Sequence, residues 1–298
     1  MPAGGVTEGA VNTDVAVVGQ IARSLVLEVD GVPDAGGTGV VRSRREALGG
    51  SGANQAAFLA RLGVSAALFG VVGDDDVGAD LLAQARWAGI DMSWVVRRPN
   101  TASGLIVELL DGAGRCRCLE DLAAPVRLTR SDVVARAEQL TRSRAVLVHL
   151  QQPPDAALAA AALGRRAGRR VVLDGAPPEE YRSALLACAD VLRAGARETQ
   201  ILADDWISSV DDAVQAGRGL LREGPGFVVL ALAGEGNVFV WREGHVFLPH
   251  IHAEKADTAV AGDAFTAALT AALSRGDGYL QAARWAVAAA ALSDEPGD

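Results

Sequence analysis

The chain has 298 residues, of which 50% are hydrophobic and 4% aromatic, enough for the core of one large α/β domain or two small ones. Its formal charge of −9 argues against nucleic acid as a partner. Residues 1–12 lack the basic and apolar regions of a signal peptide, and no run is apolar enough to span a bilayer. Three cysteines form no disulfide framework, so the sequence predicts a cytoplasmic protein that does not associate with membranes.

The first part of the chain predicts one buried strand followed by a small β lid. Residues 1–12 are rich in glycine and are predicted to be disordered. The run DVAVVG at residues 14–19 is typical of a buried parallel strand that ends in glycine. The weakly alternating segments within about residues 25–48, and a predicted hairpin within 101–120, are expected to leave the main sheet and form the lid.

From residue 130 onward, helical and strand patterns alternate regularly. This alternation predicts parallel strands that are joined by right-handed crossovers, with helices on both faces. We therefore expect a doubly wound α/β fold with a mostly parallel central sheet, in which ligands bind at the carboxyl ends of the strands. The expected helices are 132–140, 155–167, 179–188 and 210–222, and the expected strands are 145–150, 170–174, 190–193 and 227–232.

The stretch DTAVAGDAF at residues 257–265 follows a strand-like run and opens a helix. A helix start carries unpaired N–H groups and the positive end of the helix dipole, and small residues let an anion approach closely. Asp263 lies in this turn. It is either a carboxylate that interacts with the helix dipole or, beside a bound phosphate chain, a base that takes a proton from an attacking hydroxyl.

A second motif lies at residues 49–78, where Gly49-Gly50 and Asn54 are followed by glycines at 63, 70, 73 and 78. Together with DTAVAGDAF, in this order and at this separation, it resembles the ribokinase-like (PfkB-type) carbohydrate and nucleoside kinases. The resemblance covers residues 13–293, which implies a single domain of this fold. It also implies an ATP-dependent phosphotransferase that acts on a hydroxyl of a sugar, a nucleoside or a related small molecule.

The resemblance implies roles for the residues around the helix start. Asp263 corresponds to the general base, and the backbone N–H groups of Val260, Ala261 and Gly262 correspond to the anion hole for the transferred phosphoryl group. Val260 is bulkier than the Gly or Ala that is usual there. Ala259 offers no side-chain oxygen to the K⁺ site that is common in the family, so the sequence does not support activation by K⁺.

ATP and Mg²⁺ are the implied cofactors. Glu198 matches the glutamate of the N-x-x-E motif that orders Mg²⁺, but Gly195 stands at the asparagine position, and a solvated surface residue is an equally good interpretation of Glu198. Asp174 ends a strand and is either a further metal residue or part of a turn. The segment with Ala231, Gly234 and Gly236 falls at the nucleotide loop, although a hairpin turn explains these glycines equally well.

The implied substrate pocket departs most from the family. Ser24 stands where an Asp usually binds two sugar hydroxyls, and Gln151 replaces a Glu that contacts the sugar. Loss of a carboxylate acceptor can weaken substrate binding by about 1.5–3 kcal/mol per hydrogen bond. The remaining predicted substrate-binding residues are Gly50, Ser51 and Asn54. By resemblance, the lid covers the sugar and can mediate a homodimer.

Two functions remain open at this point. The retained Asp263 favours an active kinase. The simultaneous changes at Ser24, Gln151, Gly195 and Ala231 would instead suit a catalytically impaired homologue that binds a small molecule or has a regulatory role.

Overall fold

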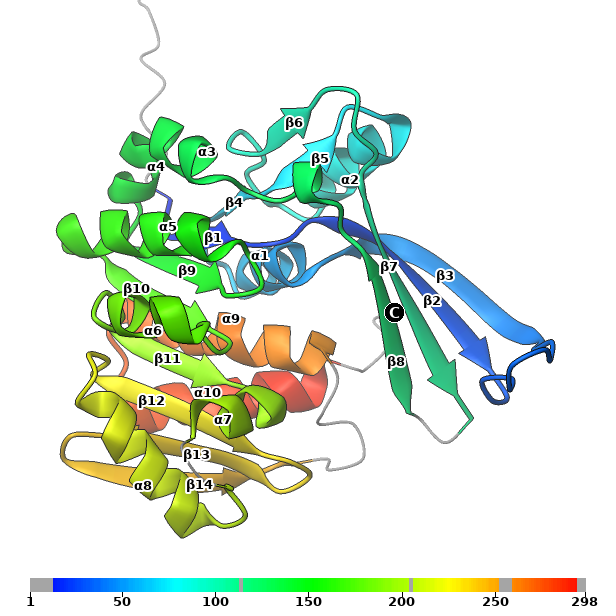
Figure 1. The fold of residues 1–298 in the computed structure, drawn as a ribbon. Coiled ribbons are helices and arrows are strands. Elements are labelled where there is room, and N and C mark those ends of the chain that lie inside the picture. Colours follow the sequence, from blue (N-terminus) through cyan, green and yellow to red (C-terminus); the bar gives the residue numbers. More distant parts are fainter. Residues whose placement is uncertain (1–12, 113–114, 204–205, 252–258, 294–298) are drawn as a thin grey trace, which may run out of the picture.

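The computed structural model describes residues 13–112, 115–203, 206–251 and 259–293, and Figure 1 shows their arrangement. The predicted disorder of residues 1–12 therefore lies outside the described residues. None of the helices in these ranges combines the length and the apolar composition that a membrane span requires.

An eight-stranded sheet forms the centre of the molecule, in the order β14-β13-β12-β11-β10-β9-β1-β4. The six strands from β4 to β12 are parallel, and β13 and β14 extend the sheet as antiparallel edge strands. This confirms the predicted α/β class with a mostly parallel sheet. The strands are β1 (Val15–Val18), β4 (Ala66–Phe69), β9 (Ala145–His149), β10 (Arg170–Asp174), β11 (Val191–Ala194), β12 (Phe227–Leu232), β13 (Gly236–Trp241) and β14 (Gly244–Pro249).

Helices cover both faces of this sheet (Figure 1). Side chains of β1 alternate between two apolar clusters, because successive residues of a strand point to opposite faces. Val15 and Val17 pack with α1, α2, α9 and α10, whereas Ala16 and Val18 pack with α3, α5, α6 and α8. The helices are α1 (Ser51–Arg61), α2 (Asp76–Trp87), α3 (Arg130–Ala135), α4 (Ala137–Arg142), α5 (Pro154–Arg166), α6 (Glu179–Leu186), α7 (Ala196–Leu202), α8 (Val210–Leu221), α9 (Ala259–Arg275) and α10 (Tyr279–Leu292), with a short 3₁₀ turn at Ala124–Val126.

A second sheet, which we call the lid sheet, projects away from the body of the molecule (Figure 1). Its order is β3-β2-β7-β8, with β2 (Ala22–Val29), β3 (Val41–Gly49), β7 (Gly104–Asp111) and β8 (Cys116–Asp121). β2 and β7 run parallel although they are distant in sequence, and each has its hairpin partner on the outer side. β3 leads directly into α1 through Gly50.

Two runs of the chain are interrupted. The apolar run at residues 66–72 breaks at Gly70, and its second half, β5 (Val71–Gly73), pairs with β6 (Val96–Arg98) instead of joining the central sheet. A Cβ at Gly70 would lie 2.7 Å from the carbonyl oxygen of Gly19, so only glycine permits this close approach. The helix expected at 132–140 is likewise divided at Arg136 into α3 and α4.

Candidate active site

Asp263 lies just after the first turn of α9 and is only 3% exposed. Its two carboxylate oxygens accept hydrogen bonds from adjacent residues of α1. Asn54 Nδ2 donates to Oδ2 at 2.9 Å, and Gln55 Nε2 donates to Oδ1 at 3.0 Å. The helices α1 and α9 pack side by side, which lets consecutive amide side chains fix the orientation of one carboxylate (Figure 1).

A second buried carboxylate shares the Gln55 amide. Gln55 Nε2 also donates to Asp174 Oδ2 at 2.7 Å, and Asp174, at the carboxyl end of β10, is 2% exposed. The other oxygen of Asp174 accepts from Arg193 Nη1 at 3.0 Å, and Arg193 comes from the neighbouring strand β11. The ends of two parallel strands and one face of α1 therefore form a continuous polar network that reaches Asp263.

The guanidinium of Arg193 packs closely against the first turn of α9. A Cβ at Gly262 would lie 3.1 Å from Arg193 Nη2, so glycine at this position makes room for the cation. The guanidinium carbon also lies 5.5 Å from the ring centroid of Phe265, which is within the range of a cation–π contact. A fixed positive charge thus lies beside the backbone turn that precedes the candidate base.

Burial raises the pKa of Asp263 to about 8, and the negative charge of Asp174 adds to this effect. The hydrogen bonds from Asn54 and Gln55 and the charge of Arg193 act in the opposite direction. A general base works best when its pKa lies near the working pH. The surroundings of Asp263 therefore suit a group that takes up and releases a proton close to neutral pH.

His149, at the end of β9, lies in the same cluster. One potential ligand atom from each of His149, Asp174 and Asp263 lies within 4.8 Å of the others. Burial lowers the pKa of the His149 imidazole, and within the described part of the chain its Nδ1 has no hydrogen-bond partner. The Gln55 amide and Arg193 each donate one hydrogen bond to Asp174, and a carboxylate can accept further ones, so the role of Asp174 near a metal ion stays a prediction.

Glu198 is the other residue with a predicted role near Mg²⁺. It lies in the first turn of α7, is half-buried, and its carboxylate folds back over Gly195. A Cβ at Gly195 would lie 2.5 Å from Glu198 Oε2. The carboxylate thus occupies the space that a side chain at residue 195 would need.

The predicted substrate-binding residues differ in their burial and in their contacts. Ser24, on β2, is 9% exposed, and its Oγ donates to Glu108 Oε1 at 2.9 Å. Gly50 has a φ of 89° and packs against the backbone of residue 20, whereas Ser51 opens α1 and is half-buried. Gln151 is exposed in the turn after β9 and makes no hydrogen bond to the described residues. Of this group, Asn54 alone is hydrogen-bonded to Asp263.

The predicted nucleotide residues belong to the β12–β13 hairpin. Ala231 is buried and pairs with Asn237 across the hairpin, while Gly234 lies in the turn with a φ of 69°. A Cβ at Gly236 would lie 2.4 Å from the carbonyl oxygen of Leu248. The hairpin itself therefore requires both glycines, and their contact with a nucleotide stays a prediction. Asp257, a possible ligand in the expected monovalent-cation region, lies outside the described residues.

Four residues of this region were not predicted from the sequence, namely Gln55, Glu108, His149 and Arg193. A signal existed for two of them: His149 is the polar last residue of the apolar strand AVLVH, and Arg193 is the charged residue within the apolar strand VLRA. Asp174 ends the strand RVVLD in the same way. Glu108 is a carboxylate inside the apolar run LIVELL, a signal that gains meaning only once its neighbouring strand is known.

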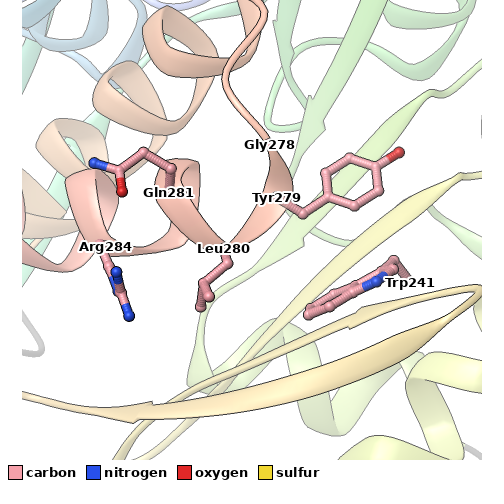
Figure 2. Close-up of a pocket in the computed structure, with 6 residues that line it drawn as sticks. All are labelled: Trp241, Gly278, Tyr279, Leu280, Gln281 and Arg284. Atoms are coloured by element: carbon pink, nitrogen blue, oxygen red, sulfur yellow. The ribbon is translucent and has the colours of Figure 1, made fainter.

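A separate hollow of about 380 Å³ lies at the start of α10 (Figure 2). It is lined by Trp241, Gly278, Tyr279, Leu280, Gln281 and Arg284. Asp263 lies at the opposite end of α9, a helix of 17 residues that spans about 25 Å. The hollow contains none of the predicted site residues.

Comparisons with known proteins show the family to which this chain belongs. The family described as "pfkB family carbohydrate kinase" matches residues 12–295. The chain belongs to this family. As a PfkB-type kinase it is 27% identical to a ribokinase of Haemophilus influenzae, over 93% of this chain and 90% of the relative. It is also 34% identical to an ATP-dependent ribose-1-phosphate kinase of Halopiger xanaduensis, over 87% of this chain and 84% of the relative.

The fold of this PfkB-type kinase matches that of solved ribokinases. The structure of Arabidopsis thaliana ribokinase complexed with ribose and ATP superimposes with a TM-score of 0.80 at 25% identity, covering 96% of this chain and 94% of that chain. The predicted family and fold class are thus confirmed.

Proposed function

We propose that this PfkB-type kinase transfers the γ-phosphoryl group of ATP to a hydroxyl of a sugar, with Asp263 as the base. The observation that carries the proposal is the orientation of Asp263. Its buried carboxylate is held near the start of α9 by the amides of Asn54 and Gln55. A base with a fixed direction and a pKa of about 8 can accept the proton of an attacking hydroxyl near neutral pH.

The first turn of α9, formed by Val260, Ala261 and Gly262, is the proposed anion hole. The positive end of this helix and the adjacent Arg193 guanidinium both favour negative charge there. Phosphoryl transfer depends mainly on positioning and on stabilising charge at the transferred group. This arrangement supplies both without a covalent intermediate.

Kinases of this type use ATP and a divalent metal ion, and we infer that Mg²⁺ is the ion here. Glu198 is the residue placed to order it through water molecules, because no described residue donates a hydrogen bond to its carboxylate. The metal ion would neutralise charge on the phosphate chain. We assign the nucleotide to the β12–β13 hairpin with Ala231, Gly234 and Gly236, and we do not propose K⁺ activation.

The alternative is a catalytically impaired homologue that binds a small molecule. It rests on the changed residues Ser24, Gln151, Gly195 and Ala231. We favour the active kinase because the carboxylate that must do the chemistry is fully oriented. Burying the carboxylate of Asp263 lowers the stability of the fold. A protein that no longer catalysed the reaction would have no need to keep it buried.

We also propose that the kinase acts in the cytoplasm as a homodimer formed through the lid sheet. The face of the lid sheet that carries Leu25, Leu27, Val107 and Leu119 has an apolar centre, flanked by charged residues such as Arg23, Glu46 and Arg117, and Leu119 is 62% exposed. An apolar face of this kind is suited to association. Cys116 and Cys118 are exposed free thiols, which suit a reducing compartment.

The proposed function is tested by measuring ADP release with MgATP and a panel of D-ribose, 2-deoxy-D-ribose, ribose 1-phosphate and nucleosides. We expect turnover with at least one sugar and a loss of about 10³-fold or more in kcat for Asp263→Asn, because general base and positioning are both lost. The matched control is Asp211→Asn, an exposed residue in the first turn of α8. Ligand-induced thermal stabilisation without any turnover would instead support the impaired homologue.

A further inference from the structure

Glu108 and Ser24 form a hydrogen-bonded pair across the middle of the lid sheet. Ser24 Oγ donates to Glu108 Oε1 at 2.9 Å, although the two residues are 84 positions apart in sequence. Ser24 lies opposite Ile106 in the parallel pair β2–β7, so Glu108 is two residues further along and points to the same face. The register of the lid sheet therefore brings a carboxylate to the side chain of Ser24.

A second residue of this face of the lid sheet acts electrostatically on the active site. Glu120 of β8 lies opposite Ile106 and shares the face, and its negative charge reaches the His149 imidazole in the catalytic cluster. A Cβ at Gly49 would lie 2.6 Å from Ser24 Cβ, so Ser24 also adjoins the Gly49–Gly50 turn that leads into α1. Arg23 and Glu46, which form an ion pair of 3.6 Å, are on the opposite face.

Glu108 retains capacity for further hydrogen bonds. Its Oε1 accepts the Ser24 hydroxyl, while its Oε2 has a long contact of 4.0 Å with Cys116 Sγ, a weak donor. A carboxylate can accept about four hydrogen bonds, and charge-assisted bonds from hydroxyl groups are the stronger kind. The side chain is half-buried and anchored on one oxygen, so its second oxygen has a defined direction.

We propose that Glu108, held in place by Ser24, is the carboxylate that binds adjacent hydroxyl groups of the sugar. It would take over on β7 the role that an Asp at position 24 of β2 has in related kinases. The carboxylates of Glu108 and Glu120 repel an anionic substituent, and the cation Arg45 lies on the same face two strands away from Glu108, on edge strand β3. The assigned substrate class is therefore a neutral sugar with free adjacent hydroxyls. This inference rests on the proposed function.

The test compares the affinity of the natural protein and of Glu108→Leu for D-ribose and 2-deoxy-D-ribose, by calorimetry and by KM. We expect Glu108→Leu to raise Kd and KM for the preferred sugar about tenfold or more, with kcat and the KM for ATP nearly unchanged. Glu46→Leu, on the opposite face of the same sheet, is the matched control and should leave sugar affinity unchanged.

Moving the carboxylate from β7 to β2 distinguishes a sugar-binding role of Glu108 from a structural role. The double variant Ser24→Asp with Glu108→Leu returns a carboxylate to the same face from β2, so we expect it to recover much of the lost sugar affinity. Ser24→Asp alone places two negative charges together and should weaken binding. Thermal unfolding without sugar identifies any variant that fails to fold.

The outcomes distinguish this inference from the proposed function. If the natural protein phosphorylates a sugar and Glu108→Leu binds that sugar equally well, the role of Glu108 is wrong while the kinase activity stands. If the double variant folds but does not recover affinity, Glu108 acts only as a structural residue. A clear preference for ribose 1-phosphate over both neutral sugars would overturn the assigned substrate class. If no sugar binds at all, both proposals are wrong.

Discussion

At the scale of single residues, burial and hydrogen bonding change the pKa of Asp263 in opposite directions. Removing a carboxylate from water disfavours its charged form, whereas two amide donors and a nearby cation favour it. Burial is the larger effect, and Asp174 reinforces it with a second negative charge. The result is a carboxylic acid that loses its proton several pH units above an exposed aspartate.

This balance predicts the pH dependence of catalysis. The base is active only when ionised, so kcat/KM for the sugar should increase about tenfold per pH unit below pH 8 and level off above it. The folded-state pKa lies above the unfolded value, so the contribution of Asp263 to stability is full below pH 4 and is lost as pH rises toward 8. The measurement is a series of initial rates from pH 6 to 9.5 at constant ionic strength. A flat profile over this range would contradict the assigned base.

The buried pair Arg193–Asp174 predicts a stability effect. Arg193→Ala leaves Asp174 buried without its charge partner, so we expect a loss of about 3 kcal/mol in the free energy of unfolding, measured by urea denaturation. Activity should also fall, because Arg193 flanks the first turn of α9.

The control for this prediction is the double variant Arg193→Leu with Asp174→Asn. It leaves no unpaired charge and should recover part of the lost stability without recovering activity. Equal destabilisation of the single and double variants would show that packing, and not charge pairing, is the main contribution of Arg193.

The residues of the site could be predicted from sequence only in part. Asp263 and Asn54 belong to motifs, and the structure brings them into direct contact. Gln151 corresponds to a motif position but lies exposed after β9, because the turn there directs Gln152 into the core instead. Arg193 and Glu108 act through partners on neighbouring strands, so their importance depends on sheet order and register, which the sequence does not express.

At the scale of elements, the close approach of α1 to the end of β1 positions the orienting amides. A Cβ at Gly52 would lie 2.5 Å from the carbonyl carbon of Gly19. Only glycine lets the first turn of α1 pack directly on this strand end. The position of Asn54 and Gln55 relative to α9 follows from this contact.

Gly52→Ala should therefore displace α1. We expect a loss of about 1–3 kcal/mol in the free energy of unfolding, from overpacking, together with a drop in kcat that exceeds the change in KM. Gly31→Ala is a suitable control, because a Cβ at Gly31 would meet no atom within 4 Å. If Gly52→Ala keeps full activity, the amide positions do not depend on this contact.

At the scale of the whole molecule, the alternating helices and strands were enough to predict the central sheet. Apolar runs such as VLAL and VVL are buried on both faces, as a parallel sheet covered by helices requires. The strand break at Gly70 and the pairing of β5 with β6 were not predictable, because they depend on how closely Gly19 and Ile21 approach from the connection between β1 and β2.

The direct passage from β3 through Gly50 into α1 has a consequence for how sugar binding is linked to the base. The lid sheet and the helix that carries Asn54 and Gln55 are parts of one uninterrupted segment, so a tilt of the sheet would be transmitted to α1. A sugar that draws the lid sheet inward would thereby also shift the two amides that hold the proton acceptor.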